Sequence, residues 1–215
     1  MKRNLTELVF ILDRSGSMAG LEGDTIGGFN AMLEKQRRQE GRALVSTVLF
    51  NTVTHILHDR VPLDRVEPMT KDDYCPGGGT ALLDAVGSAI AHIGNIHKYA
   101  HPEDRPNRTL FVITTDGLEN ASRRYDYETV KAMVTRQQER YGWEFLFLGA
   151  NIDAAAEARR FGISPDRVAE YCCDAQGTAL NYDVIGEAVS RARRCQPLTA
   201  DWSERIHEDR RKRGK

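Results

Sequence analysis

The chain contains 215 residues, of which 40% are hydrophobic and 28% charged, and its formal net charge is −1. This length and composition suit one globular α/β domain, or one domain with a tail. The balanced charge argues against a protein that binds nucleic acid or a membrane surface as a whole. No apolar stretch approaches the roughly 20 residues that a membrane-spanning helix needs.

The first part of the chain predicts a strand, a helix and a strand pair. The apolar run 8–12 ends at Asp13 and is typical of a central parallel strand that is buried on both faces. Apolar residues at helical spacing predict a helix over residues 24–39. Strands are expected over residues 44–50 and 55–61, and the turn between them is so short that they must be antiparallel.

The rest of the chain alternates between helices and strands. In chain order the pattern predicts a helix over 81–101, a strand over 110–113, a helix over 127–141, a strand over 144–148, a helix over 154–161, a strand over 168–172 and a helix over 179–194. This alternation indicates an α/β fold with a mainly parallel sheet and one antiparallel edge strand. After Pro197 the sequence turns polar and basic, so we expect a domain over residues 1–197 and a flexible tail over 198–215.

Polar residues gather where the predicted strands end. Asp13, Ser15 and Ser17 directly follow the first strand, and Asp116 directly follows the fourth. Thr80 ends a glycine-rich loop that leads into the helix before the fourth strand. In a doubly wound sheet, ligands bind outside the carboxyl ends of the strands, where the winding reverses. If the first and fourth strands are neighbours at that reversal, the three segments meet at one place.

The side chains of this cluster are carboxylates and hydroxyls, which are hard oxygen ligands. Such ligands favour Mg²⁺, with Mn²⁺ or Ca²⁺ as alternatives, over zinc or copper. Two carboxylates and three hydroxyls carry too little charge to enclose a divalent ion fully. We therefore expect an open coordination position that water or a carboxylate from outside fills, and a site that binds an acidic partner rather than one that catalyses a reaction.

The pattern resembles the metal-ion-dependent adhesion site of von Willebrand factor type A (VWA) domains. The resemblance covers about residues 5–195 and rests on the DxSxS sequence, the threonine in a glycine-rich loop and the second aspartate in Thr-Thr-Asp-Gly. It implies a Rossmann-like sheet with strand order 3-2-1-4-5-6 and a bacterial-type, intracellular, single-domain protein. It also implies a metal bound by five residues and a protein partner that supplies a Glu or Asp. The five positions are Asp13, Ser15, Ser17, Thr80 and Asp116.

Other interpretations of these residues remain open. Asp13 after the first strand could accept a phosphoryl group in a phosphohydrolase, but a second carboxylate would then be expected where Ser15 stands. The chain could also be a structural scaffold whose site is unused. At the level of local structure, Thr80 could cap the following helix, and Asp153 could cap the helix after the fifth strand. Glu119 and Asn120 lie close to Asp116 in sequence and could support the site, but the sequence favours a role outside it.

The four cysteines indicate a reducing compartment. They form no CxxC pair and no zinc-binding spacing, so free thiols are expected. Glu7 interrupts the apolar N-terminal segment, which is also too short for a signal peptide. We therefore expect a cytoplasmic protein.

Overall fold

The computed structural model describes residues 5–214 and contains a six-stranded sheet in the order β3-β2-β1-β4-β5-β6. All neighbouring strands are parallel except β2 and β3, which are antiparallel. The predicted fold class and strand order are therefore confirmed. The strands are β1 (Leu5–Asp13), β2 (Arg42–Phe50), β3 (Thr54–Pro62), β4 (Arg108–Thr115), β5 (Glu144–Gly149) and β6 (Val168–Glu170).

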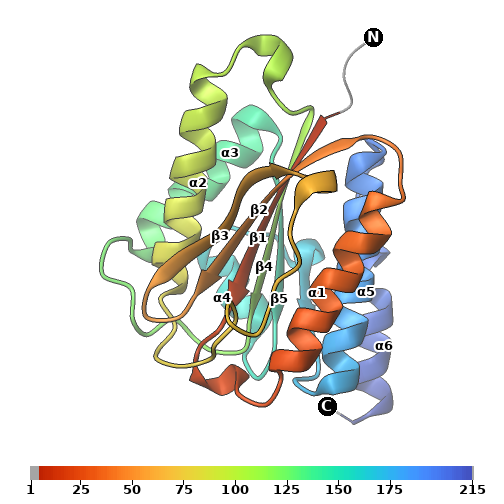
Figure 1. Cartoon of the computed structure of the whole chain (residues 1–215). Helices are drawn as coiled ribbons and strands as arrows, with labels where there is room; N and C mark the ends of the chain where they lie inside the picture. Colours follow the sequence, from red (N-terminus) through yellow and green to blue (C-terminus); the bar gives the residue numbers. More distant parts are fainter. Residues whose placement is uncertain (1–4, 215) are drawn as a thin grey trace.

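Helices cover both faces of this sheet. Figure 1 shows α1, α5 and α6 on one side and α2 and α3 on the other. The helices are α1 (Glu22–Arg37), α2 (Leu82–Tyr99), α3 (Tyr127–Tyr141), α4 (Ala154–Arg160), α5 (Ala175–Arg193) and α6 (Glu204–Lys212). Such double coverage explains why the central strands carry unbroken apolar runs rather than alternating apolar and polar residues.

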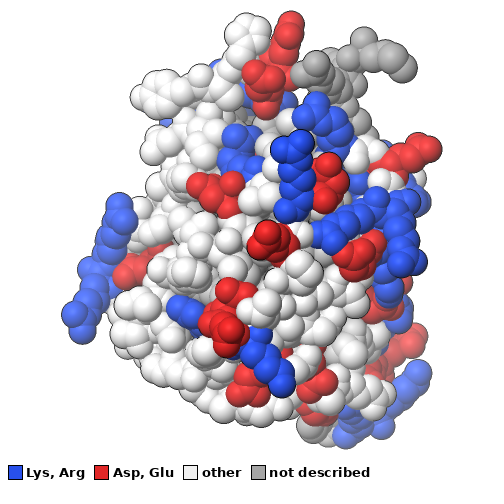
Figure 2. Space-filling view, viewed as in Figure 1, with Lys and Arg blue, Asp and Glu red and all other residues white. Residues whose placement is uncertain are grey.

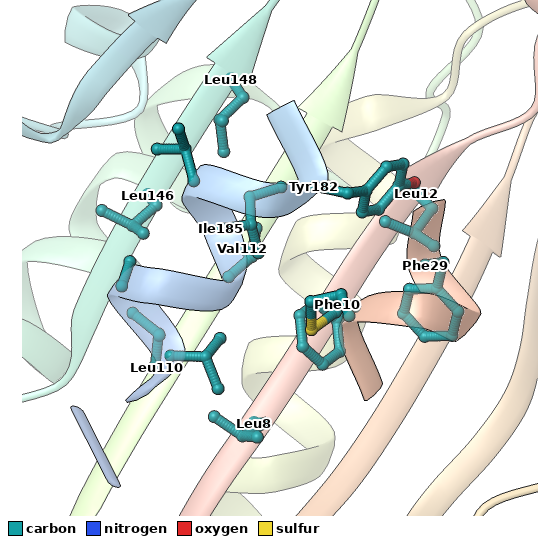
Figure 3. Close-up of a cluster of buried hydrophobic side chains, with 14 of the residues drawn as sticks. Leu8, Phe10, Leu12, Phe29, Leu110, Val112, Leu146, Leu148, Tyr182 and Ile185 are labelled. Atoms are coloured by element: carbon teal, nitrogen blue, oxygen red, sulfur yellow. The ribbon is translucent and has the colours of Figure 1, made fainter. Parts of the chain in front are cut away.

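The first strand shows how this double burial works. Leu8, Phe10 and Leu12 point to the face of the sheet that α1 and α5 cover, where they pack in one hydrophobic core (Figure 3). Val9 and Ile11 point to the opposite face and belong to a second core with residues of α2, α3 and α4. Because successive side chains of a strand alternate between faces, an unbroken apolar run supplies both cores at once.

The last long helix begins earlier than its apolar pattern predicts. We expected residues 179–194, but α5 starts at Ala175. The Asp174 carboxylate accepts a hydrogen bond of 2.8 Å from the Gly177 amide and caps the first turn. An aspartate in this position satisfies an amide that has no partner within the helix, so the helix extends toward it.

The expectation of a flexible tail over residues 198–215 is wrong for the part that the structure describes. Residues 204–212 form α6, and Leu198, Trp202 and Ile206 are buried in the core beneath α5. The Trp202 indole also donates a hydrogen bond of 2.9 Å to the Asp166 carbonyl. Two ion pairs add to this docking, Arg210–Glu170 and Arg213–Asp174. Three apolar residues spaced four apart form the buried stripe, which the high charge of the segment obscured.

The charged side chains do not form one large patch on the face that Figure 2 shows. Lys and Arg are interspersed with Asp and Glu over α1 and α5, next to a broad uncharged area. Within residues 5–214, none of the helices has the length and apolar character required to span a bilayer.

Candidate metal centre

Three loops meet at the carboxyl end of the sheet, at the lower end of Figure 1. β1 and β4 are adjacent and parallel, with Leu12 beside Thr114, so the segments that follow them emerge together. The glycine-rich loop joins them through two backbone hydrogen bonds, from the Gly16 amide to the Gly78 carbonyl (3.2 Å) and from the Gly77 amide to the Arg14 carbonyl (2.9 Å). The reversal of winding between β1 and β4 therefore creates the meeting point that the sequence predicted.

Four of the five predicted residues form one chain of hydrogen bonds, in which one link runs through the Ser15 backbone amide. The Ser15 amide donates to Asp13 Oδ1 (2.7 Å), and the Ser15 and Ser17 hydroxyl oxygens lie 3.1 Å apart. The Ser17 hydroxyl then donates to Asp116 Oδ1 (2.6 Å) across 99 residues of sequence. The structure thus brings these four residues together through direct contacts.

Thr80 lies on the other side of the same small space. A β-carbon at position 117 would lie 3.2 Å from the Thr80 hydroxyl oxygen and 3.9 Å from that of Ser17. Gly117 therefore keeps open a space that a side chain would fill, and two hydroxyls border that space. The Thr80 hydroxyl therefore lies near the Ser17 hydroxyl, which belongs to the hydrogen-bonded chain of the other four predicted residues.

Thr80 is not a helix cap. The N-cap of α2 is Ala81, which makes no side-chain capping bond, and the amide of Leu83 is satisfied by the Glu119 carboxylate (2.8 Å). The Thr80 backbone is held instead by Asn120, whose side-chain oxygen accepts from the Thr80 amide (2.8 Å). Asn120 therefore supports the site by fixing a predicted ligand, and the hydroxyl of Thr80 takes no part in capping.

The electrostatics of the cluster favour a bound cation. Asp13 and Asp116 are only 2% and 4% exposed. Burial raises the pKa of the Asp13 carboxyl, and the charge of Asp116 raises it further, while hydrogen bonds from Thr115 and Ser15 act in the opposite direction. Two buried carboxylates that repel each other are stabilised by a positive charge between them.

The donor set fits a hard divalent ion. Within residues 5–214, no group of three or more His, Cys, Asp and Glu side chains is placed to hold a metal, so this cluster depends on hydroxyls as well as carboxylates. An all-oxygen set with only two carboxylates is typical of Mg²⁺ sites that retain outside ligands.

Three contributors to the site were not predicted. The Thr115 hydroxyl donates to Asp13 Oδ2 (2.6 Å), the Tyr74 hydroxyl donates to the Asp13 carbonyl, and the Cys173 thiol lies 3.9 Å from Asp116 Oδ2. Thr115 had a visible signal, because it directly precedes Asp116 at the end of a predicted strand. Tyr74 and Cys173 had none, because both lie in segments whose sequence shows no motif.

The arrangement of sheet and loops defines a class of protein, the VWA domains. Consistent with this, the family described as VWA domain containing CoxE-like protein matches residues 1–143, which is more than half of the chain. The chain belongs to this family. A comparison with curated proteins gave no match.

Solved VWA structures share the fold at low sequence identity. A von Willebrand factor type A protein from Catenulispora acidiphila is 14% identical with a TM-score of 0.60, over 87% of this chain and 42% of that one. Proximal thread matrix protein 1 from the mussel byssus, with a zinc-occupied MIDAS motif, is 13% identical with a TM-score of 0.59, over 86% of this chain and 46% of that one. The vWF domain of the type V pili tip protein Mfa5 from Porphyromonas gingivalis is 11% identical with a TM-score of 0.59, over 90% of this chain and 98% of that one. The chain spans less than half the length of the first two proteins.

Proposed function

We propose that the loop cluster binds one divalent cation, preferentially Mg²⁺, and that this cation binds a Glu or Asp side chain of a protein partner. The ligands are Asp13, Ser15, Ser17, Thr80 and Asp116. The observation that carries the proposal is the hydrogen bond of 2.6 Å between Ser17 and Asp116 Oδ1, which joins oxygen ligands from the loops after β1 and β4. A divalent ion would replace such hydroxyl–carboxylate contacts with bonds to the same oxygens.

The charge of the cluster supports a receptor for acidic groups. Two carboxylates at most balance the charge of a divalent ion, and the three hydroxyls are neutral. A carboxylate from outside is therefore still attracted to the ion, and the attraction is stronger because the site has a low dielectric constant. Ser17 is the exposed member of the cluster, so the partner approaches from its side. Leu118 is 55% exposed just after Asp116 and offers an apolar contact beside the ion.

The hydrogen bonds of Asp13 support its role as a metal ligand. Its Oδ1 accepts from the Ser15 amide (2.7 Å) and its Oδ2 accepts from the Thr115 hydroxyl (2.6 Å). The two bonds fix the orientation of the carboxylate, and each oxygen keeps a second lone pair that a divalent ion can take.

Metal binding is tested by thermal unfolding with and without millimolar MgCl₂. Mg²⁺ should raise the melting temperature of the wild type, with a stabilisation of about 2.7 kcal/mol at 100 times the dissociation constant. Asp116→Ala should abolish the shift, and Asp104→Asn, at an exposed position at the other end of the sheet, should preserve it. An unchanged melt in Mg²⁺, Mn²⁺ and Ca²⁺ would exclude the metal site.

Carboxylate capture is tested with Mn²⁺ as a paramagnetic probe. Bound Mn²⁺ with exchangeable water enhances the relaxation of water protons, and a peptide with a central Glu should lower the enhancement by displacing that water. The same peptide with Gln should have a much smaller effect. Equal effects of the two peptides on a metal-loaded protein would retain the metal site but contradict the acidic partner.

A further inference from the structure

We propose that the chain has a second ligand site, at the opposite end of the sheet from the metal centre, which binds a small organic anion with a flat apolar body. A cavity of about 490 Å³ lies between α2, α3 and the start of β4. This volume is within the range of about 300–1,000 Å³ that small-molecule sites occupy. Neither the metal proposal nor the acidic partner involves any residue of this cavity.

The inner wall of the cavity is aromatic and rigid. Trp143 lines it and is stacked on Phe111, with ring centroids 5.2 Å apart and an angle of 16° between the planes. The His97 ring packs edge-on against Trp143, with ring centroids 5.4 Å apart, and Ile90 adds an aliphatic surface. A wall held by ring stacking on a buried strand is preorganised for a flat apolar body.

The rim of the cavity is basic. Lys98, Arg105 and Arg136 line it, and none of the described lining residues is an Asp or Glu. Among residues 5–214, no carboxylate forms an ion pair with any of these three. Arg105 is positioned by hydrogen bonds to the Ala100 carbonyl (3.2 Å) and the Lys98 carbonyl (3.4 Å). An anion would give the three cations the charged partner that the protein does not supply.

The buried carboxylate beside His97 does not compensate this charge. Glu7 is fully buried, and its Oε2 accepts from Arg60 (2.9 Å) and lies 3.1 Å from His97 Nε2. The charge of Glu7 is therefore already paired with that of Arg60, and neither residue lines the cavity.

A glycine inside α2 keeps the cavity open. Gly94 lies in the interior of the helix, where glycine costs about 1 kcal/mol relative to alanine. A β-carbon there would lie 3.4 Å from Gln137 Nε2 and 4.0 Å from the Trp143 ring, which are ordinary contacts. Packing thus permits an alanine, and what the glycine provides is free volume beside Trp143.

The test uses 2-naphthoate and 1-naphthyl phosphate as anionic probes and 2-naphthamide as the neutral match, each titrated by calorimetry into the full chain. Both anions should bind more tightly than the amide, and comparing them shows which head group the rim prefers. In a Trp202→Phe background, the remaining tryptophan is Trp143, and its fluorescence should change with the same affinity.

Variants locate the site. Arg136→Gln should weaken binding of the anions about tenfold, as expected for loss of a charged hydrogen bond. Arg140→Gln, one turn further along α3 and outside the cavity lining, should leave it unchanged. Gly94→Ala should raise the melting temperature yet weaken binding, which a folding defect cannot imitate, and Gly94→Leu should abolish binding.

Three outcomes would overturn the proposal. They are absence of binding by both anions at millimolar concentration, equal affinity for the anions and the amide, and binding that survives both Gly94→Leu and Arg136→Gln. Each is independent of the metal centre, because the titrations are repeated with EDTA and with Asp116→Ala and should be unaffected.

Discussion

Asp13 depends on contacts that come from different strands. It is the last residue of β1, and the hydroxyl that holds its Oδ2 belongs to Thr115 on β4. The same hydroxyl oxygen accepts from the Gly117 amide (3.3 Å), so one threonine orders the loop that carries Asp116 as well. A residue that touches no metal in our proposal thus sets the position of both carboxylates.

We expect Thr115→Val to weaken Mg²⁺ binding about 10- to 100-fold, as loss of a residue that orients metal ligands does. The folded state should also lose about 1–3 kcal/mol, because a buried carboxylate oxygen loses its donor. Thr115→Ser keeps the hydroxyl and should retain most of both properties. Calorimetric titration with Mg²⁺ and urea unfolding measure the two effects, and wild-type affinity in Thr115→Val would contradict the role assigned to this residue.

His58 predicts a dependence of stability on pH. Burial lowers the pKa of its imidazole from the ordinary value of 6.5, against smaller opposing effects of the Glu67 backbone and the charges of Asp73 and Glu67. Below pH 6.5 the unfolded chain therefore takes up a proton that the folded chain resists, so stability is lost as the pH falls. His58→Gln should remove this part of the loss, which is at most about 1.4 kcal/mol per pH unit. Urea unfolding of the wild type and of His58→Gln between about pH 7.5 and pH 5 gives the slope of the unfolding free energy against pH for each. Equal slopes would rule out His58 as a source of the pH dependence.

At the scale of elements, a glycine makes room for a close contact between α1 and α5. A β-carbon at Gly28 would lie 2.5 Å from a ring carbon of Tyr182, whereas one at Gly27 meets nothing within 4 Å. Tyr182 also packs edge-on against Phe29, with ring centroids 6.3 Å apart. The two helices therefore contact each other at a position where only the smallest residue fits without displacing the ring.

We expect Gly28→Ala to destabilise the protein by about 1–3 kcal/mol, because the added methyl forces Tyr182 out of its packed position. Gly27→Ala is the matched control on the same helix and should stabilise it by up to about 1 kcal/mol through helix propensity. Chemical denaturation of the two variants decides the matter. If both changed stability in the same direction, the packing explanation would be wrong.

At the scale of the whole molecule, the C-terminal segment belongs to the same core as the sheet. Trp202 is buried in the core that also contains Leu8 of β1 and Val189 of α5. Arg213 at the end of α6 pairs with Asp174, the residue that caps α5 (2.8 Å). The segment is therefore joined to the body by both apolar packing and charge.

We expect Trp202→Ala to lower the free energy of unfolding by about 3–5 kcal/mol, the cost of truncating a buried tryptophan. Tyr99→Ala removes an aromatic ring that is 78% exposed and should change the free energy of unfolding by less than about 0.5 kcal/mol. Unfolding should remain a single transition in both, followed by circular dichroism and by fluorescence. A wild-type free energy in Trp202→Ala would mean that the segment adds nothing to the fold.

The sequence by itself determined the strands, the sheet class and the residue types of the candidate metal centre. Unbroken apolar runs predicted the central strands, and carboxylates and hydroxyls at strand ends predicted the site, because both signals are local in the chain. The VWA resemblance supplied the strand order, which the structure confirms.

Only the tertiary structure decided which distant residues touch. The Ser17–Asp116 bond spans 99 residues, and the Thr115–Asp13 bond spans 102, so both depend on the register of β1 against β4 rather than on any local pattern. The docking of residues 198–212 was hidden because the three large apolar residues of this segment are outnumbered by charges and need a partner surface to be recognised. The basic cavity near Trp143 is formed by α2, α3 and the start of β4, and a space between elements leaves no signal in a linear sequence.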